Sequence, residues 1–173
     1  MNDSFFSYLQ QIELMAFFTG YPLVYALVKF IADKQPISRL FKFHAASLLP
    51  YAYALVGTIY LALQLKKLYP SYSIESIHLH IQLPLLTGWA LLSILFWIPA
   101  IAKKPVLSLL HSLVFFFFLV KDIFFQSPGD KDILQNAMKI YTTSILLNLG
   151  AFLSVILICI LAGSKKSNNS RVK

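Results

Sequence analysis

The chain has 173 residues, of which 58% are hydrophobic and 13% are charged, whereas an ordinary soluble domain carries roughly 25% charged residues. Its mean hydropathy is +0.69, so there are too few polar side chains to cover a water-facing surface. The formal net charge of +8 comes from short basic clusters between apolar runs, which indicate membrane topology and not nucleic-acid binding. The composition excludes a water-soluble globule and predicts an integral membrane protein that contacts the lipid bilayer.

Five apolar segments, taken in chain order, approach the roughly 20 helical residues that are needed to cross a bilayer. They cover residues 14–32, 44–65, 81–102, 106–125 and 140–163. None shows the alternation of a membrane β-strand. We therefore expect an all-α, five-helix transmembrane bundle with short loops, forming a single domain over residues 1–164. Residues 165–173 are polar and basic, and we expect a disordered cytoplasmic tail there.

The distribution of basic residues predicts the orientation of the bundle. With five spans, an outside N-terminus and a cytoplasmic C-terminus, ten of the 15 basic residues lie inside and five lie outside, as the positive-inside rule favours. Segment 106–125 needs this argument because Lys121 and Asp122 lie near its outer end. If it did not span, the ratio would fall to nine against six. The predicted location is a membrane, crossed several times, which in a bacterium is the inner membrane.

Four prolines lie inside the predicted spans: Pro22, Pro50, Pro84 and Pro99. Each removes a backbone hydrogen bond and disturbs the preceding turn, so kinks or local unwinding are expected at these positions. Such breaks can expose carbonyl groups to a ligand, but they also occur in helices that only pack.

Two histidines lie on the same predicted side of the membrane and suggest one cofactor hypothesis. His111 lies inside the fourth span, whereas His44 begins the second span at the interface. A pair of histidines on facing helices could ligate a b-type haem, although these two differ in depth by more than one turn. The alternative is an interfacial histidine and a buried histidine that is hydrogen-bonded across helices. We therefore predict no cofactor and keep haem as an alternative.

A second possible ligand set lies in the loop between the second and third spans. Glu75, His78 and His80 have spacings that occur in metal sites, but a carboxylate-bridged centre needs a second motif of this kind, and the sequence contains none. We predict interfacial residues and no metal site. The single cysteine, Cys159, lies deep in the last apolar run, where we expect it to pack as a small apolar residue.

Polar side chains on two other spans predict a pocket or a helix contact. Tyr53, Tyr60 and Gln64 lie on one stripe of the second span, together with Gly57. Asn148 lies near the middle of the fifth span, where a polar side chain needs a hydrogen-bond partner. These four polar residues could line a substrate pocket or could hold neighbouring helices together.

The sequence contains no nucleophile with its base, no phosphate-binding loop and no redox CxxC motif. We therefore expect no enzyme but an accessory or scaffolding subunit, whose partners are the bilayer and other membrane subunits or copies of itself. The alternatives are a small transporter or ligand-binding bundle, and a haem- or quinone-binding protein that uses His111.

Overall fold

The computed structural model of the chain describes residues 3–34, 39–69, 83–125 and 131–169, and it contains no strand within these ranges. Three helices are long and apolar enough to cross a membrane, namely Gln10–Ala32, Ala46–Leu68 and Leu134–Ala162. Two shorter apolar helices cover Pro84–Trp97 and Pro105–Lys121. The all-α prediction is confirmed, and the three long helices fit a membrane protein.

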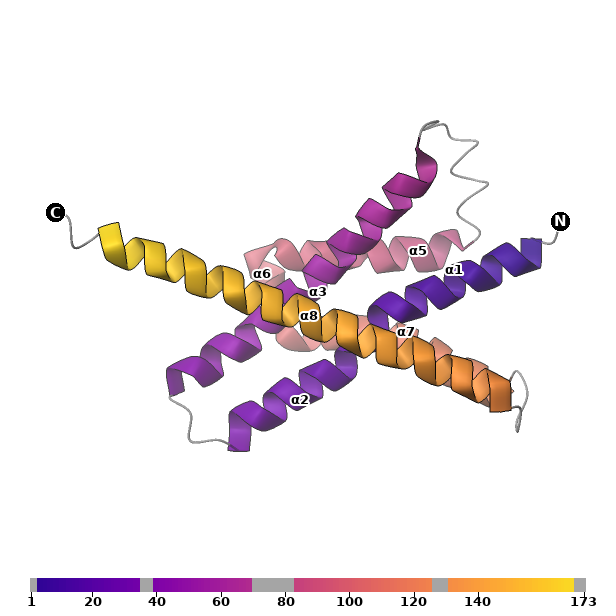
Figure 1. The fold of residues 1–173 in the computed structure, drawn as a ribbon, viewed down its shortest axis with the longest axis horizontal. Coiled ribbons are helices and arrows are strands. Elements are labelled where there is room, and N and C mark those ends of the chain that lie inside the picture. Colours follow the sequence, from indigo (N-terminus) through magenta and orange to yellow (C-terminus); the bar gives the residue numbers. More distant parts are fainter. Residues whose placement is uncertain (1–2, 35–38, 70–82, 126–130, 170–173) are drawn as a thin grey trace.

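Successive passes of the chain run in opposite directions through the molecule (Figure 1). In chain order the elements are α1 (Asp3–Phe18), α2 (Tyr21–Lys34), α3 (Arg39–Leu68), α5 (Pro84–Leu91), the 3₁₀-helix η1 (Leu92–Trp97), α6 (Pro99–Ala102), α7 (Pro105–Phe125) and α8 (Lys131–Asn169). Helices α1 and α2 together make one pass, as do α5, η1 and α6. The two ends of the chain lie at opposite ends of the bundle.

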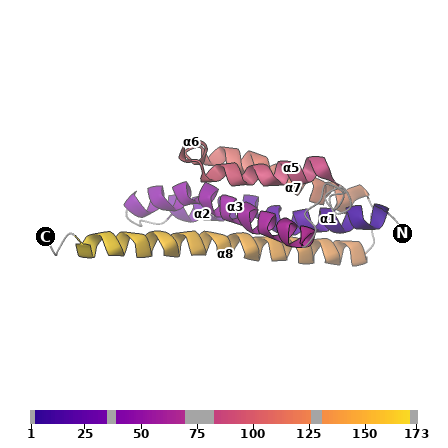
Figure 2. The ribbon, with the colours of Figure 1, turned by 90° about the horizontal axis from the view of Figure 1, so that it is seen from above.

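The bundle has three layers when it is viewed from above (Figure 2). Helix α8 forms one outer layer, α5 to α7 form the other, and α1, α2 and α3 lie between them. The central layer therefore has protein on both faces. Its buried core is aromatic and includes Phe18, Tyr21, Tyr53 and Tyr60, each at most 1% exposed.

The first predicted span is broken in the middle. Helix α1 ends at Phe18 and α2 begins at Tyr21, so Thr19 and Gly20 form a turn between two half-helices. Pro22 lies in the first turn of α2, where its fixed φ fits and its missing N–H costs little. A break is what the proline predicted, although it lies before Pro22. Pro50, in contrast, lies inside the uninterrupted helix α3.

The third predicted span is not one continuous helix, which corrects the expectation for residues 81–102. Within its described part, α5 is followed by six residues of 3₁₀-helix and then by the short helix α6. Ile98 has an extended backbone, with φ −74° and ψ 119°, because the following Pro99 disfavours the helical region for its neighbour. Residues 81 and 82 lie outside the described part of the chain.

Helix η1 runs very close to α3. A methyl group added at Gly57 of α3 would overlap with the Ser93 Oγ and would lie 3.0 Å from the Ser93 Cβ. The Trp97 indole N–H donates to the Thr58 hydroxyl at 2.9 Å. The lack of a side chain at Gly57 therefore permits this contact, as is common where membrane helices approach closely.

The last two predicted spans are helical in the structure. Helix α7 begins one residue before the predicted segment 106–125 and ends with it. Helix α8 extends beyond 140–163 at both ends, from Lys131 to Asn169. It therefore covers part of the region in which we expected a tail, and residues 170–173 lie outside the described part of the chain.

Candidate functional site

His111 on α7 lies between two aromatic residues from the neighbouring helices. Its Nδ1 is 2.7 Å from the hydroxyl of Tyr53 on α3, and its Nε2 is 2.9 Å from the carbonyl oxygen of Trp89 on α5. The Trp89 indole stacks on the imidazole with 4.8 Å between ring centroids and 7° between ring planes. The indole N–H also points back to the His111 carbonyl oxygen at 3.3 Å. His111 thus joins α3, α5 and α7.

The two hydrogen bonds of His111 determine where its proton lies. A carbonyl oxygen can only accept, so Nε2 must donate its hydrogen to Trp89. In a neutral imidazole Nδ1 is then the acceptor, and the Tyr53 hydroxyl donates to it. A neutral histidine therefore satisfies both partners. An iron atom bound to either nitrogen would have to displace Tyr53 or Trp89.

A second polar pair lies beside the first one. The hydroxyls of Tyr21 and Ser108 are 2.7 Å apart, and Ser108 donates to the Pro105 carbonyl at 2.7 Å. Ser108 therefore accepts its hydrogen bond from Tyr21. The ring centroids of Tyr21 and Tyr53 lie 4.4 Å apart. The aromatic rings of Phe18, Phe96 and Phe115 pack against the first pair, Tyr53 and His111. The arrangement is a closed polar network inside an aromatic core.

The other polar cluster joins α8 to the break between α1 and α2. The Asn148 amide donates to the carbonyls of Phe17 and Ser144, each at 2.8 Å. The Ser144 hydroxyl accepts the Gly20 N–H at 2.7 Å. Broken membrane helices need such partners, because lipid offers none to the released backbone groups. Ser144 and Asn148 thus satisfy groups that the break leaves without their helical partners.

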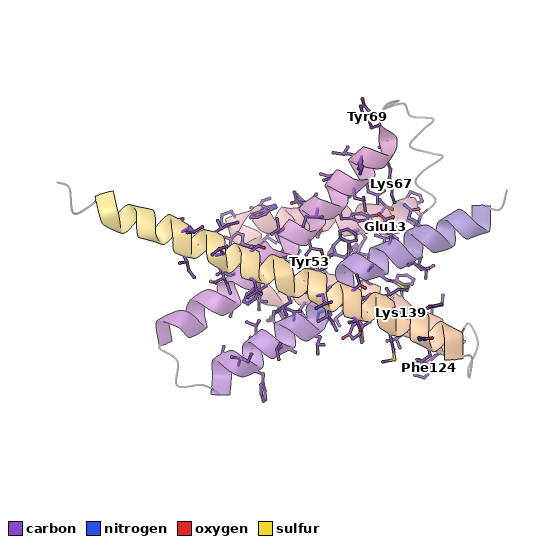
Figure 3. The ribbon with its side chains drawn as sticks, in the orientation of Figure 1. Glu13, Tyr53, Lys67, Tyr69, Phe124 and Lys139 are labelled. Carbon is purple, nitrogen blue, oxygen red and sulfur yellow. The ribbon has the colours of Figure 1, made fainter. Side chains whose placement is uncertain are left out.

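A charged cluster lies at the end of the bundle near the N-terminus. Glu13 of α1 forms an ion pair with Lys67 at the end of α3, and Gln64 donates to the same carboxylate at 3.1 Å. Figure 3 shows Glu13 and Lys67 on neighbouring helices. Nearby, the Tyr60 hydroxyl approaches that of Thr87, but it makes no well-formed hydrogen bond among the described residues. This cluster ties the start of the first span to the end of the second.

The structure separates the residues that the sequence singled out. Tyr53 and His111 meet, and Tyr60 packs against Phe18 with 5.5 Å between their ring centroids. Gln64 belongs to the charged cluster of Glu13 and Lys67, and Asn148 belongs to the cluster at the break between α1 and α2. The side chain of His44 lies outside the described part of the chain, as do Glu75, His78 and His80. Within the described residues, no three His, Cys, Asp or Glu side chains are grouped as metal ligands, and Cys159 is exposed.

Several polar contacts were not predicted from the sequence, and two sets of them join α1 or α2 to the third and fourth predicted spans. One is the Tyr21–Ser108 pair. The other is Gln10, whose Oε1 accepts the Leu83 N–H at 3.0 Å and whose amide donates to Thr87 at 2.9 Å. Gln10 thereby joins α1 to the start of α5. The available signal for Tyr21 was a polar group inside an apolar span, whereas Gln10 precedes the predicted span 14–32. The partners of both residues lie more than 70 residues away.

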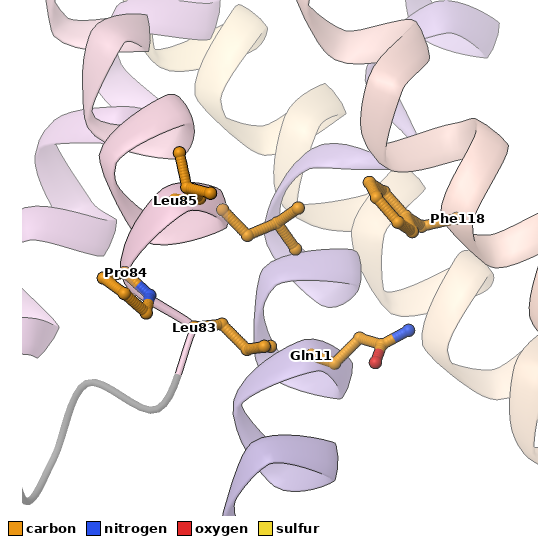
Figure 4. Close-up of a pocket in the computed structure, with 6 residues that line it drawn as sticks. Gln11, Leu83, Pro84, Leu85 and Phe118 are labelled. Carbon is orange, nitrogen blue, oxygen red and sulfur yellow. The ribbon is translucent and has the colours of Figure 1, made fainter.

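An open groove of about 290 Å³ lies on the outside of the bundle, between α1, α5 and α7 (Figure 4). It is lined by Gln11, Leu83, Pro84, Leu85, Leu86 and Phe118. Its lining is almost entirely apolar, and it does not include His111, Tyr53 or Asn148. It is therefore separate from the buried polar network.

Most of the polar side chains in these clusters are buried and make hydrogen bonds between helices. Tyr53, Ser108 and Asn148 are each at most 2% exposed, and His111 is 9% exposed. Comparisons with protein-family models, with curated proteins and with solved structures found no match for the chain. The function must therefore be inferred from the chain itself.

Proposed function

We propose that this chain is a non-enzymatic accessory or scaffolding subunit of a membrane complex. The observation that best supports this is a difference in burial. Most polar groups of the interior have partners within the chain, whereas the apolar helix α8 in one outer layer is largely uncovered. The buried polar side chains bond to one another and to backbone carbonyls of their own and neighbouring helices. In contrast, only 22% of the most apolar stretch of α8 is buried, compared with 50% for that of Gln10–Ala32 and 44% for that of Ala46–Leu68.

The exposed part of α8 is apolar over several turns. Leu146, Leu153, Leu157 and Leu161 are between 56% and 64% exposed. On the same helix, Gly150 has no atom within 4 Å of the position that a side chain would occupy. In membranes, helices associate through close packing at small residues. This face is suited to contact a partner helix within the bilayer.

We expect the tagged chain to co-purify with a partner in fixed stoichiometry when native membranes are dissolved in a mild detergent. Replacing Leu153, Leu157 and Leu161 with alanine should remove that partner, because the contact face of α8 is lost. The matched control replaces Leu110, Leu113 and Phe117 on the exposed side of α7, and it should retain the partner. Recovery of the unmodified chain as a lone monomer would contradict the scaffold proposal.

The proposal includes five membrane crossings with a cytoplasmic C-terminus. The alternating directions of the five passes support it (Figure 1), and so does the pairing of Glu13 with Lys67 at one end of the bundle. Lys103 and Lys104 lie in the turn between α6 and α7, at the other end. In a membrane, the Glu13–Lys67 pair and the Lys103–Lys104 turn would then lie in opposite headgroup regions.

Reporter fusions test this topology. A reporter fused after Lys173 should be cytoplasmic, whereas one inserted at Ser127 should be on the opposite side, because α8 lies between the two positions. A third fusion at Lys104 serves as the control and should match the C-terminal one. If the Ser127 and Lys173 reporters are found on the same side, the five-span topology is wrong.

A small transporter or ligand-binding bundle is the second candidate. It is favoured by the broken first span, because transporters often bind their substrates where a membrane helix is discontinuous. The long 3₁₀ stretch in η1 also fits, since such stretches inside helices often mark hinges. A chain that purifies without a partner but binds a ligand at the break would favour this function.

A further inference from the structure

The hydrogen bond between His111 and Tyr53 crosses from one layer of the bundle to the next. His111 belongs to α7 in an outer layer, and Tyr53 belongs to α3 in the central layer (Figure 2). Other side-chain hydrogen bonds also join these two layers, namely those of Gln10 with Thr87, Tyr21 with Ser108 and Trp97 with Thr58. None of those groups changes its charge between pH 5 and 8, whereas an imidazole can. His111 is therefore the titratable member of this set of contacts.

The neutral imidazole of His111 has no free nitrogen. Its Nε2 donates to the Trp89 carbonyl, and its Nδ1 accepts from the Tyr53 hydroxyl. A further proton can be added only at Nδ1, in the place that the Tyr53 hydrogen occupies, so the Tyr53 hydroxyl must then turn away. The Tyr53 side chain is 0% exposed, and its hydroxyl bonds to His111 among the described residues. Protonation therefore leaves a buried donor without its acceptor.

The described surroundings of His111 contain no negative charge to balance an imidazolium. The imidazole is contacted by the rings of Tyr53 (α3), Trp89 (α5), Phe96 (η1) and Phe115 (α7), and behind these rings lie those of Phe18 (α1) and Tyr21 (α2). Of these side chains only the two tyrosines titrate, and their phenols are neutral near pH 7. Glu13, the one acid among the described side chains, pairs with Lys67 at the end of the bundle.

Two further interactions act on a charged His111 in opposite directions. The Trp89 indole lies flat on the imidazole, so an imidazolium would gain a cation–π attraction. Lys104 lies seven residues earlier, roughly 10 Å along the helix, and would repel the charge. The His111 side chain is only 9% exposed, and removing an unpaired charge from water costs more than a cation–π contact returns. The folded network therefore suits the neutral histidine.

We propose that His111 is a pH-sensitive lock between the central layer and the outer layer that contains α7. Neutral His111 holds α7 against α3 through Tyr53. Protonation turns the Tyr53 hydroxyl away and places a charge among aromatic rings, so α7 and η1 loosen from α3 and the imidazole reaches water. This inference goes beyond the scaffold proposal and does not depend on a partner.

The direction and size of the effect follow from proton linkage. A histidine in contact with water takes up its proton near pH 6.5. The closed network takes up none without breaking, so below this pH the unfolded chain binds more protons than the folded one, and acid disfavours folding. Between about pH 7.5 and about pH 5.5, the ratio of folded to unfolded chain should fall about tenfold. For a chain of this length, that change lowers the melting temperature by a few degrees.

Thermal unfolding of the purified full-length chain in detergent tests the lock. We expect the unmodified chain to melt a few degrees lower at about pH 5.5 than at about pH 7.5. His111→Gln, whose side chain cannot become charged, should lose this difference. The matched control replaces the other three histidines, His44, His78 and His80, with glutamine. It should keep the full difference, because the lock is intact.

Hydrogen exchange locates the effect and needs no variant, so it also decides the case if His111→Gln does not fold. Amide exchange is divided by the rate of an unstructured peptide at the same pH. On acidification of the unmodified chain, it should then accelerate in α7 and η1 relative to α8, because local opening exposes those amides.

Four results would overturn the proposal. They are equal melting of the unmodified chain at both pH values, an undiminished acid effect in folded His111→Gln, loss of the effect in the three-histidine control, and exchange that accelerates equally in α7, η1 and α8. Each of them would leave the co-purification test of the scaffold role unaffected.

Discussion

Replacing Gly20 with alanine should lower the free energy of unfolding by about 3 kcal/mol, the upper part of the usual range for overpacking. A methyl group at this position would lie 2.7 Å from the Ile145 Cα and closer still to the Ile145 nitrogen and the Ser144 carbonyl carbon. These are backbone atoms of α8, so no side-chain rotation can relieve the overlap. The helices must separate, which also strains the hydrogen bond from the Gly20 N–H to Ser144. Denaturant titration of the chain in detergent measures the change.

Gly150→Ala is the matched control for this prediction. Gly150 lies on α8, the helix that Gly20 contacts, but nothing lies within 4 Å of its added methyl group. Alanine is the better helix former by about 1 kcal/mol, so the isolated chain should be equally stable or slightly more stable. Equal losses in the two variants would show that the close contact at Gly20 does not determine stability.

His111→Ala should also destabilise the chain by about 3 kcal/mol, because it leaves a cavity and deprives the Tyr53 hydroxyl of its acceptor. Tyr53→Phe removes only a hydroxyl and should cost about 1 kcal/mol. The double variant should cost less than the sum of the two, with a coupling of about 1 kcal/mol, because both changes remove the same hydrogen bond. Chemical denaturation of the four proteins completes the cycle.

Pairing His111→Ala with Ser154→Ala provides the control cycle. Ser154 is exposed on α8, where its hydroxyl donates to the carbonyl of Gly150 on the same helix, and it shares no partner with His111. The two changes should be additive. If Tyr53→Phe is likewise additive with His111→Ala, the 2.7 Å contact between these side chains contributes nothing to stability.

Much of the helix layout could be predicted from hydrophobicity alone. The apolar segments located α3, α7 and α8, since a helix that faces lipid or an apolar core needs a continuous apolar stretch. Proline chemistry predicted interruptions at four positions, because a missing N–H is a local property. The chain is interrupted near Pro22 and at Pro99, whereas α3 continues through Pro50 and α5 begins at Pro84. The polar stripe on α3 was also predicted, because Tyr53, Tyr60 and Gln64 recur at a spacing that places them on one face of a helix.

What the sequence by itself determined, then, is the all-helical class, the apolar character of the passes and several of the polar residues that need partners, such as Tyr53, His111 and Asn148. Which residues satisfy one another was decided only by tertiary structure. Tyr53 meets His111 across 58 residues and Phe17 meets Asn148 across 131, because contacts of this kind depend on how the layers stack. No periodicity within one helix contains that information. The same reason explains why Gly20 and Gly57 became close contacts while Gly150 did not: each glycine permits close approach, but only the packing of the layers decides which one is approached.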